Sequence, residues 1–475
     1  MAPMPELEPR EYALSHFCPG YPKPREKRSS VWALFRSARN SWIDALYARS
    51  YSMQMGEVHL PGVDLYMVND PALVRRMLSG QPDQFPKSPL LADALRPLLG
   101  DSILTTNGDQ WQRQREMMNP AFAQAKLDVA FPVMRAAADD LVERLTEAAQ
   151  RGSELNIEVE LTHVTADIIY RTIFSEPLSG DDAHKVFDAF ARFQALAPKL
   201  MLPSMYGVRW LVWPWNVWQS RRAASDIRRL LEKLIRSRHE AWLRGDDLGK
   251  NDILSALMTS RDRKTGEPFS FDELVDQVAV LFLAGHETSA SALTWAVYLL
   301  SAVPEVQERV HQETCRVFGQ RTPEQRDMKA LVLTRNVFRE TLRLFPPVGF
   351  MARESAQTCP MRDKMVPKGA SVMISPWLIH RHRERWSDPD AFNPDRFDDD
   401  ASRESIRQSY LPFGMGPRVC LGAAFALQEA TLILASLIRA FRLETVTGHT
   451  PMPVGRLTIR SDNGVRLRIF KREDQ

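Results

Sequence analysis

Hydrophobic residues recur every three or four positions over most of the chain, from about residue 121 to residue 440. This is the period of a helix with one buried face, so the central part of the chain is predicted to be helical almost throughout. We therefore expect a mainly α fold. The clearest helical stretches cover residues 127–151, 157–174, 219–244, 270–302 and 328–344.

Alternation of apolar and polar residues, the period of a strand, is confined to short stretches near the two ends of the chain. The first covers residues 56–68. The second covers residues 454–470 and has Asn463-Gly464 near its centre, a pair that favours tight hairpin turns. Each stretch is predicted to form a hairpin, which gives the fold a minor β part.

Composition places the chain among ordinary globular proteins, with 25% charged and 44% hydrophobic residues and a formal net charge of +3. The basic residues are interleaved with acidic ones, so nucleic acid is not expected as a partner. No repeat, linker or shift in composition divides the chain. We expect an N-terminal arm, residues 1–30, followed by one large domain, residues 31–475.

The cysteines and the N-terminal stretch indicate the compartment. The four cysteines lie far apart without a Cys-x-x-Cys pair, so neither a zinc site nor a disulfide framework is predicted. The first thirty residues are rich in proline and charge, and they lack the apolar core of a signal peptide or of a membrane anchor. A cytoplasmic protein without a transmembrane segment is expected.

The predicted helix over residues 270–302 has an unusual centre. Ser270 and Glu273 form a capping-box pattern at its start, and its length of roughly 50 Å is enough to cross a domain. Its middle reads AGHETSA, residues 284–290, although glycine and a carboxylate are costly inside a buried helix. The segment is therefore either a locally solvated helix face or a groove in which a ligand lies against the helix.

A second candidate site is PFGMGPRVCLG, which leads into a long apolar helix near the C-terminal end. Cys420 stands at the start of this helix, where unpaired N–H groups and the helix dipole favour the metal-binding thiolate. Arg418 adds a positive charge, and Gly414, Gly416 and Gly422 leave room for a flat, bulky group. A lone cysteine before a helix is usually a small buried apolar residue, but these surroundings favour a metal ligand.

This loop closely resembles Phe-x-x-Gly-x-Arg-x-Cys-x-Gly, the signature of the cytochrome P-450 family of haem-thiolate monooxygenases. Phe413, Gly416, Arg418, Cys420 and Gly422 match every fixed position. The resemblance extends over nearly the whole chain. It implies the cytochrome P-450 fold, with haem b between the long central helix and the cysteine-loop helix, and Cys420 as the axial ligand of the haem iron.

Other motifs of the family are matched in order along the chain. Glu340 and Arg343 would by themselves predict a surface ion pair, but they match the family's Glu-x-x-Arg helix, and Arg396 matches the arginine of its Pro-Glu-Arg-Phe stretch. The resemblance implies that the three form a structural charge cluster. It also implies a set of residues that bind the haem or its propionates: Trp111, Arg115, Ala284, Gly285, Arg353, Phe413, Gly414, Gly416, Arg418 and Gly422.

The AGHETSA segment resembles the family's oxygen-binding groove, through Ala284, Gly285, Glu287 and Thr288. The resemblance implies that Thr288 donates a hydrogen bond to the bound oxygen. Glu287 would then couple Thr288 to a supply of protons from water, a task for a partly buried carboxylate. His286 is assigned no role.

An apolar pocket and a lipophilic substrate are implied as well. The expected lining is Phe282, Val348, Phe350, Met351, Thr458 and Ile459. Trp210, Trp213, Trp215 and Trp218 resemble the family's lid over the substrate entrance by their position. Two interpretations of these tryptophans stay open, packing under a loop or a surface that contacts a membrane or a partner.

Electrons are expected from separate proteins, because no dinucleotide fingerprint or flavin domain follows Cys420. The resemblance implies a ferredoxin and a ferredoxin reductase that deliver electrons from NAD(P)H, with Arg113 among the candidates for docking. The main hypothesis is a dioxygen-dependent monooxygenase. The alternatives are a peroxide-using haem-thiolate enzyme and a haem-dependent binding protein without catalysis.

Overall fold

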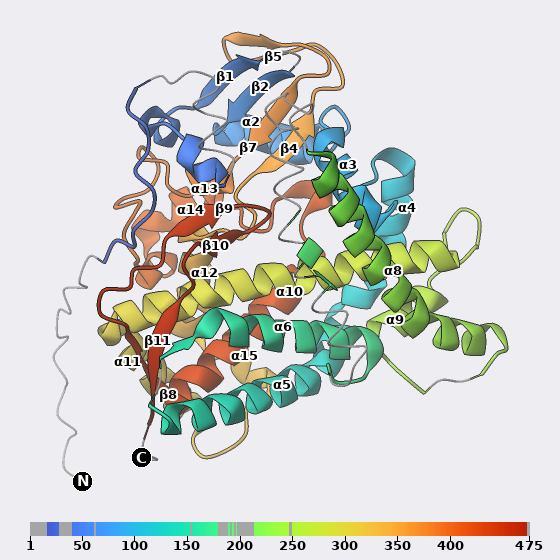
Figure 1. Cartoon of the computed structure of the whole chain (residues 1–475). Helices are drawn as coiled ribbons and strands as arrows, with labels where there is room; N and C mark the ends of the chain where they lie inside the picture. The colour runs from blue at the N-terminus through green and yellow to red at the C-terminus, as the bar shows by residue number, and fades with distance from the viewer. Residues whose placement is uncertain are drawn as a thin grey trace.

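The computed structural model describes residues 17–27, 40–60, 63–152, 154–178, 189–190, 192–193, 196, 213–246 and 249–472. Helices make up most of this part of the chain, and short strands gather at one end and along one side (Figure 1). The expectation of a mainly α fold with a minor β part is confirmed. The predicted turn at 61–62, Trp210 and most of the N-terminal arm lie outside the described residues.

The long helices follow the predicted ranges closely. α6 (Ile157–Phe174) and α10 (Phe271–Ala302) agree with the prediction to within one residue, and α8 (Pro214–Leu243) begins five residues early. Proline suits the first turn of α8 because it has no N–H to leave unpaired there. The other described helices are α2 (Pro71–Arg75), α3 (Pro89–Leu99), α4 (Gly108–Met118), α5 (Gln124–Gln150), α9 (Ile253–Thr259), α11 (Pro304–Phe318), α12 (Val332–Leu344), α13 (Pro376–Ile379), α14 (Arg403–Ser409) and α15 (Ala423–Ala440).

Short strands and turns complete the described part. The strands are β1 (Met55–Leu60), β2 (Val63–Val68), β3 (Leu155–Asn156), β4 (Met351–Glu354), β5 (Cys359–Met361), β6 (Lys364–Val366), β7 (Ser371–Ile374), β8 (Phe441–Thr445), β9 (Pro453–Gly455), β10 (Ile459–Ser461) and β11 (Arg466–Lys471). Single turns of 3-10 helix occur at η1 (Trp42–Ala45), η2 (Ala48–Tyr51), η4 (Asn119–Phe122), η6 (Gln325–Lys329), η7 (Pro394–Phe397), η8 (Asp400–Ser402) and η9 (Gly416–Arg418), and η3 (Arg76–Gly80) is a π turn.

The first predicted hairpin is confirmed, because β1 and β2 pair antiparallel from Met55↔Val68 to Leu60↔Val63. The prediction of a hairpin over 454–470 is wrong. β10 pairs with β9, whereas β11 pairs with β8 and β3, so the two alternating runs belong to different sheets. The Asn156 side chain accepts a hydrogen bond from the Val465 N–H at 3.1 Å, and this contact directs β11 to β3 directly after the turn.

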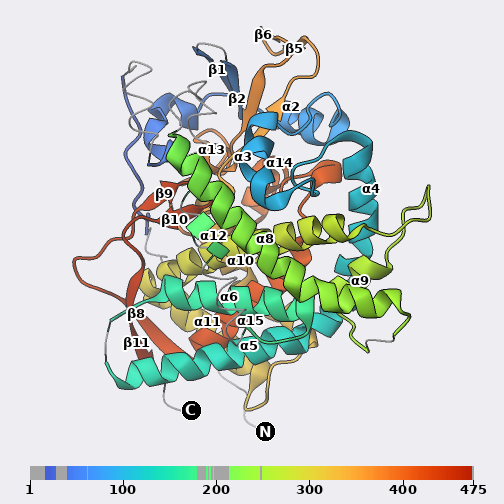
Figure 2. The ribbon, with the colours of Figure 1, turned by 45° about the vertical axis from the view of Figure 1, so that its right-hand side comes forward.

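α10 runs through the middle of the helical layer and packs closely against α6 (Figures 1 and 2). A Cβ atom at Gly285 would lie 2.8 Å from the Ile169 side chain on α6, so glycine is what allows the two helices to approach. The Thr165 hydroxyl of α6 donates to the His286 carbonyl at 3.1 Å and fixes the register. Gly285 therefore serves helix packing in this structure.

α15 is long and apolar enough to cross a membrane, by length and composition alone. More than half of it, 56%, is buried inside the fold. It packs against α5, α11 and α12, and its buried leucine and isoleucine side chains belong to the largest apolar cluster. These contacts make α15 a core helix of the described fold.

Glu429 on α15 is a buried carboxyl group, 1% exposed, that faces Ser289 on α10. The Ser289 hydroxyl donates to it at 2.7 Å, and no ion pair to Glu429 is present among the described residues. Burial raises the pKa of Glu429 to about 8, and the Ser289 hydrogen bond offsets only part of this. The residue is therefore expected to be protonated in the folded protein at neutral pH.

Glu429→Gln is predicted to make the apparent melting temperature depend less on pH. Between the ordinary pKa of glutamate, 4.5, and about 8, the folded protein keeps a proton that the unfolded chain releases, so the free energy of unfolding falls as the pH rises through this window. The variant keeps the acceptor for Ser289 without this proton. It should match the wild type near pH 5 and melt roughly a few °C higher near pH 8. If the melting temperatures of the variant and the wild type changed in parallel across the pH range, the assignment of Glu429 as a protonated group would be contradicted.

Candidate functional site

The cysteine loop is closed on itself and packs against η3. The Cys420 N–H donates to the Phe413 carbonyl at 2.9 Å, and Gly416 has a φ of +71°, a conformation that favours glycine. A Cβ atom there would lie 2.1 Å from the Leu78 carbonyl oxygen, so Gly416 also allows close contact between the two backbones. The loop is thus held rigidly just before α15.

Cys420 is exposed, although protein surrounds its thiol on most sides. Burial raises the pKa of the thiol, while the Gly422 backbone N–H and the Arg115 charge act in the opposite direction. Arg115, from α4, also donates to the Val419 carbonyl at 2.7 Å and so ties α4 to the loop. A Cβ atom added at Gly422 would have no other atom within 4 Å, so there is open space two residues after the cysteine.

A cluster of three cations lies beside this loop, of which Arg353 is buried and Lys87 and Arg418 are partly buried. Arg418 reaches the carbonyls of Pro82 and Phe85 at 2.9 and 3.2 Å, and its guanidinium lies 5.1 Å from the centre of the Trp111 ring. Lys87 lies 5.9 Å from the same ring, and its neighbour across a β-bridge is Arg353. Burial, followed by the charges of Arg418 and Arg353, lowers the pKa of Lys87 to about 6.

These cations lack the partners that buried charges require. Burial and the Arg418 charge lower the pKa of Arg353 to about 10. The Nε atoms of Arg353 and Arg418 have no hydrogen-bond acceptor, and among the described residues no carboxylate forms an ion pair with Lys87, Arg353 or Arg418. Since an unpaired buried charge is costly, the cluster fits a ligand that carries more than one negative charge, such as the two propionates of a haem.

Sequence reasoning identified Trp111, Arg353 and Arg418 but missed Lys87. The lysine lies in the segment DQFPKS, residues 83–88, which has no distinctive pattern, so nothing local distinguishes it from a surface lysine. The strand bridge to Arg353 and the cation–ring contact with Trp111 reveal it. Among the described residues no group of three or more histidine, cysteine or acidic side chains could hold a metal ion.

The middle of α10 presents a narrow accessible strip. Ala284 is exposed and Thr288, one turn later, is partly exposed, whereas the neighbouring His286 and Glu287 are buried, 1% and 4% exposed. The Thr288 hydroxyl donates to the Ala284 carbonyl at 2.6 Å. An exposed alanine and a partly exposed threonine thus form an accessible strip in the centre of an otherwise buried helix.

The residues expected to line the pocket divide into two groups. Val348 is 41% exposed and Phe350 and Met351 are partly exposed, and the Met351 sulfur lies 3.7 Å from where a Cβ of Gly414 would be. By contrast, Phe282 is fully buried against Phe190, with ring centroids 4.7 Å apart, so its side chain belongs to the core.

Thr458 and Ile459, the expected lining residues at the tip between β9 and β10, have other contacts as well. The Thr458 hydroxyl donates to the Glu287 carboxylate at 2.6 Å, and Ile459 is fully buried in the main apolar cluster. These two residues therefore connect the tip to α10 in this structure. Arg460, which the sequence analysis did not select, donates to both Glu287 oxygens, at 2.8 and 2.6 Å.

Glu340, Arg343 and Arg396 are brought together in the interior, with side chains 0%, 0% and 3% exposed. Arg343 binds the Glu340 carboxylate through two nitrogens at 2.8 Å, and the Arg396 Nε reaches it at 3.2 Å. The Arg343 guanidinium also donates to the carbonyls of His380, Pro389 and Ala391, at 2.8, 2.6 and 2.9 Å. The cluster thereby fixes backbone segments far apart in the sequence.

Comparison with known proteins gives the family. The family model described as Cytochrome P450 matches residues 35–463. The chain belongs to the cytochrome P450 family. It is 32% identical over 403 residues to cyclooctatin synthase of Streptomyces melanosporofaciens, with 84% of each chain covered. It is 30% identical to pentalenene oxygenase of Streptomyces avermitilis, over 88% of this chain and 90% of that protein.

Among solved structures, the retinoic acid-bound cyanobacterial CYP120A1 superposes with a TM-score of 0.76 at 26% identity, over 88% of this P450 and 92% of that chain. The recognition of the family and of its fold from sequence is therefore confirmed. The chain is a P450 monooxygenase, an oxidoreductase with a haem-iron cofactor, and the unpaired cations beside Cys420 fit that cofactor.

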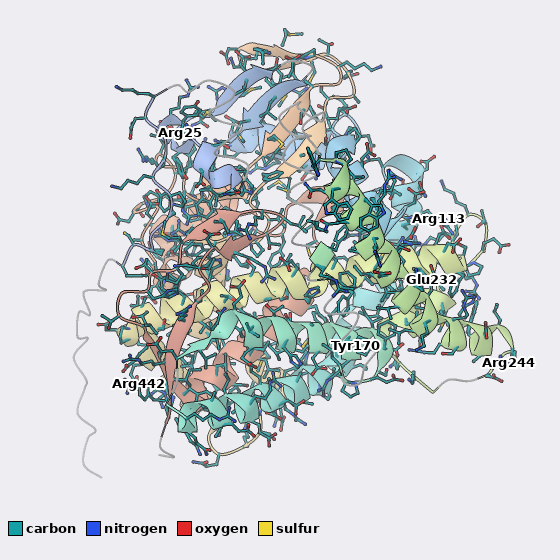
Figure 3. The ribbon with its side chains drawn as sticks, in the orientation of Figure 1. Arg25, Arg113, Tyr170, Glu232, Arg244 and Arg442 are labelled. Carbon is teal, nitrogen blue, oxygen red and sulfur yellow. The ribbon has the colours of Figure 1, made fainter. Side chains whose placement is uncertain are left out.

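Two surface features can now be placed. Arg113, labelled in Figure 3, forms ion pairs with Asp262 and Glu273 at 3.1 and 2.5 Å and is 25% exposed, so it is not a free cation for docking a partner.

Trp213, Trp215 and Trp218 of the P450 are 68%, 55% and 48% exposed, which excludes packing beneath a loop for these residues.

Loss of the Glu340 carboxylate is predicted to prevent accumulation of haem-loaded P450. Glu340→Ala would leave two buried guanidinium groups without their anion, at a cost of ~3–5 kcal/mol. The matched control is Asp395→Ala, which removes an equally bidentate partner of Arg309 at 38% exposure and should cost ~0–1 kcal/mol. Both variants are assayed by their haem content per protein and by their melting temperature. Normal haem content in Glu340→Ala would refute the structural role.

Proposed function

We propose that this P450 holds haem b through Cys420 and oxidises a lipophilic small molecule, with two electrons delivered from NAD(P)H by separate redox proteins. The observation that carries the proposal is the juxtaposition of an exposed, backbone-fixed thiol and a cluster of buried and partly buried cations that form no ion pair among the described residues. When bound, the haem supplies dioxygen activation, which the thiolate favours by electron donation. The propionates would be held by Lys87, Arg353 and Arg418, beside Trp111.

Thr288 and Glu287 are proposed to supply protons. In the structure the Thr288 hydroxyl donates to the Ala284 carbonyl, and rotation about its Cβ–Oγ1 bond would turn that hydrogen toward a ligand bound beside the helix. Glu287 is the neighbouring acid, buried beside the same stretch of helix. A positioned acid or base typically contributes about 10²–10⁴-fold to a rate, which is the size of effect proposed for this pair.

A lipophilic substrate is supported by the partly exposed apolar side chains of Val348, Phe350 and Met351, of which Met351 adjoins the cysteine loop. The names of the relatives agree with this class, since pentalenene oxygenase and the retinoic acid-bound protein act on or bind molecules with little polar surface. We propose a substrate of that kind, taken up with displacement of water from an apolar pocket.

The redox partners are proposed to be a ferredoxin and its reductase, as expected from the sequence, and the location is proposed to be cytoplasmic. The bacterial relatives support both. Because Arg113 is committed to Asp262 and Glu273, docking of an acidic ferredoxin would rely on other basic residues.

Cys420→His is predicted to abolish the strongly red-shifted absorption of the reduced, carbon monoxide-bound protein, because that band requires a thiolate ligand. The control is Cys359→Ala, which removes a buried thiol on β5 that is 3% exposed. It should leave the band unchanged. Persistence of the band in Cys420→His would disprove the ligand assignment.

Thr288→Ala is predicted to uncouple electron consumption from product formation. With surrogate redox proteins, NAD(P)H and a panel of lipophilic compounds, product per NAD(P)H should fall severalfold and hydrogen peroxide should rise, while the substrate-induced change in the haem spectrum persists. Glu287→Gln should mainly slow turnover.

The matched control for this experiment is Thr294→Ala. Thr294 lies on the same helix and donates to the Ala290 carbonyl at 2.7 Å, but it is 2% exposed and lies outside the accessible strip. It should stay coupled. Equal coupling in both variants would argue against dioxygen activation at Thr288, and turnover with peroxide alone would favour the peroxide-using alternative. Spectral binding without turnover under any condition would favour a binding protein.

A further inference from the structure

The Glu287 carboxylate is fully occupied, and none of its recorded hydrogen bonds goes to Thr288. One oxygen accepts from the Thr458 hydroxyl at 2.6 Å and from the Arg460 Nε at 2.8 Å. The other accepts from the Arg460 Nη2 at 2.6 Å. A carboxylate bound in this way is ionised and has no proton to give.

Arg460 stands between this buried carboxylate and the surface. Its Nη1 binds a second acid, Glu158 at the start of α6, at 2.7 Å. The side chains are 5% exposed for Glu287, 21% for Arg460 and 17% for Glu158. One guanidinium is therefore shared by an acid in the interior and an acid near solvent.

The backbone that carries Arg460 is fixed. The Ile459 carbonyl accepts from the Ser291 hydroxyl at 2.6 Å and from the Trp295 indole at 3.1 Å, and the Ile459 N–H donates to the Pro347 carbonyl at 3.0 Å. β10 is thus tied to α10 and to the segment before β4. Movement at this site has to come from the long Arg460 side chain rather than from its strand.

Burial and the charge of Arg460 act on the pKa of Glu287 in opposite directions. Burial acts to raise the pKa of Glu287, but the charge and hydrogen bonds of Arg460 outweigh burial and lower it, with a smaller contribution from His286 on the same helix. Glu158 acts on the pair through Arg460. Without the guanidinium, burial alone would favour the neutral acid. Arginine itself cannot pass the proton on, because it stays protonated in proteins.

We propose that Arg460 is the positioning residue that controls proton delivery by Glu287, an inference that rests on the proposed function of Glu287 as proton supply. While the guanidinium faces Glu287, the carboxylate stays ionised. When the guanidinium turns to Glu158 alone, Glu287 takes up a proton from water and becomes a neutral acid that can donate toward the Thr288 strip. Glu158 thereby competes with Glu287 for one cation.

The protonation state can be measured without turnover, by infrared spectroscopy of the haem-loaded protein near pH 7. Arg460→Met should show the C=O stretch of a protonated acid that is absent from the wild type and that disappears in the double variant Arg460→Met, Glu287→Gln. The buried acid Glu429 is common to all these variants and cancels in the differences. Arg460→Lys keeps the charge and should show no such band. An ionised Glu287 in Arg460→Met would overturn the proposal.

Kinetics test the competition without disturbing the buried pair. Glu158→Gln removes the alternative partner, so Arg460 stays on Glu287, and kcat should fall severalfold with a larger solvent isotope effect and an unchanged KM. The matched control is Glu154→Gln, which removes the exposed partner of Arg468 at 3.2 Å nearby in sequence and should leave kcat unchanged. Equal kcat in the two variants would overturn the proposal.

The two measurements separate this inference from the proposed function. If the infrared band appears in Arg460→Met but Glu287→Gln turns over normally, Arg460 sets the charge of Glu287 but Glu287 does not supply protons, and the proposed function of Glu287 fails together with the control by Arg460. If Glu287→Gln is slow but no band appears, the proposed function stands and the inference about Arg460 is refuted.

Discussion

Buried positive charge without a protein partner is the constraint on which the rest of the site depends. Lys87, Arg353 and Arg418 come from three separate parts of the chain and converge beside Cys420. Each would be destabilising alone in the interior, and together they repel one another. In the proposed function a negatively charged cofactor completes this arrangement, which would couple haem binding to the stability of this region.

α10 and the Glu340 cluster supply the rigidity that this arrangement requires. Gly285 brings α10 against α6, and Arg343 ties α12 to backbone carbonyls from His380 to Ala391. The cysteine loop and the accessible strip of α10 are therefore held by contacts that do not involve the reacting groups. The parts of the site that can move are side chains. Arg460 is the clearest case because the strand that carries it is fixed.

Sequence patterns with a local physical cause were predicted well. The helical period and the capping box at Ser270 gave α10 to within a residue, and the full loop motif identified Cys420 and its family. Lys87 and Arg460 were missed because each is a single basic residue whose surroundings come from distant segments. The resemblance implied that Phe282 lines the pocket, but its ring packs against Phe190 in the core, a contact with a distant segment that the motif does not show.

The sequence by itself determined the long helices and the family, and it singled out Cys420 as the candidate ligand, because these depend on period, capping and a contiguous motif. The tertiary structure decided which strands and which charged side chains pair with one another. It directed β10 and β11 into different sheets, because a contact from Asn156 redirects the chain after Gly464. It also paired Glu287 with Arg460, a residue 173 positions away. Electrostatic partners and strand neighbours are set by distance in space, which spacing along the chain does not encode.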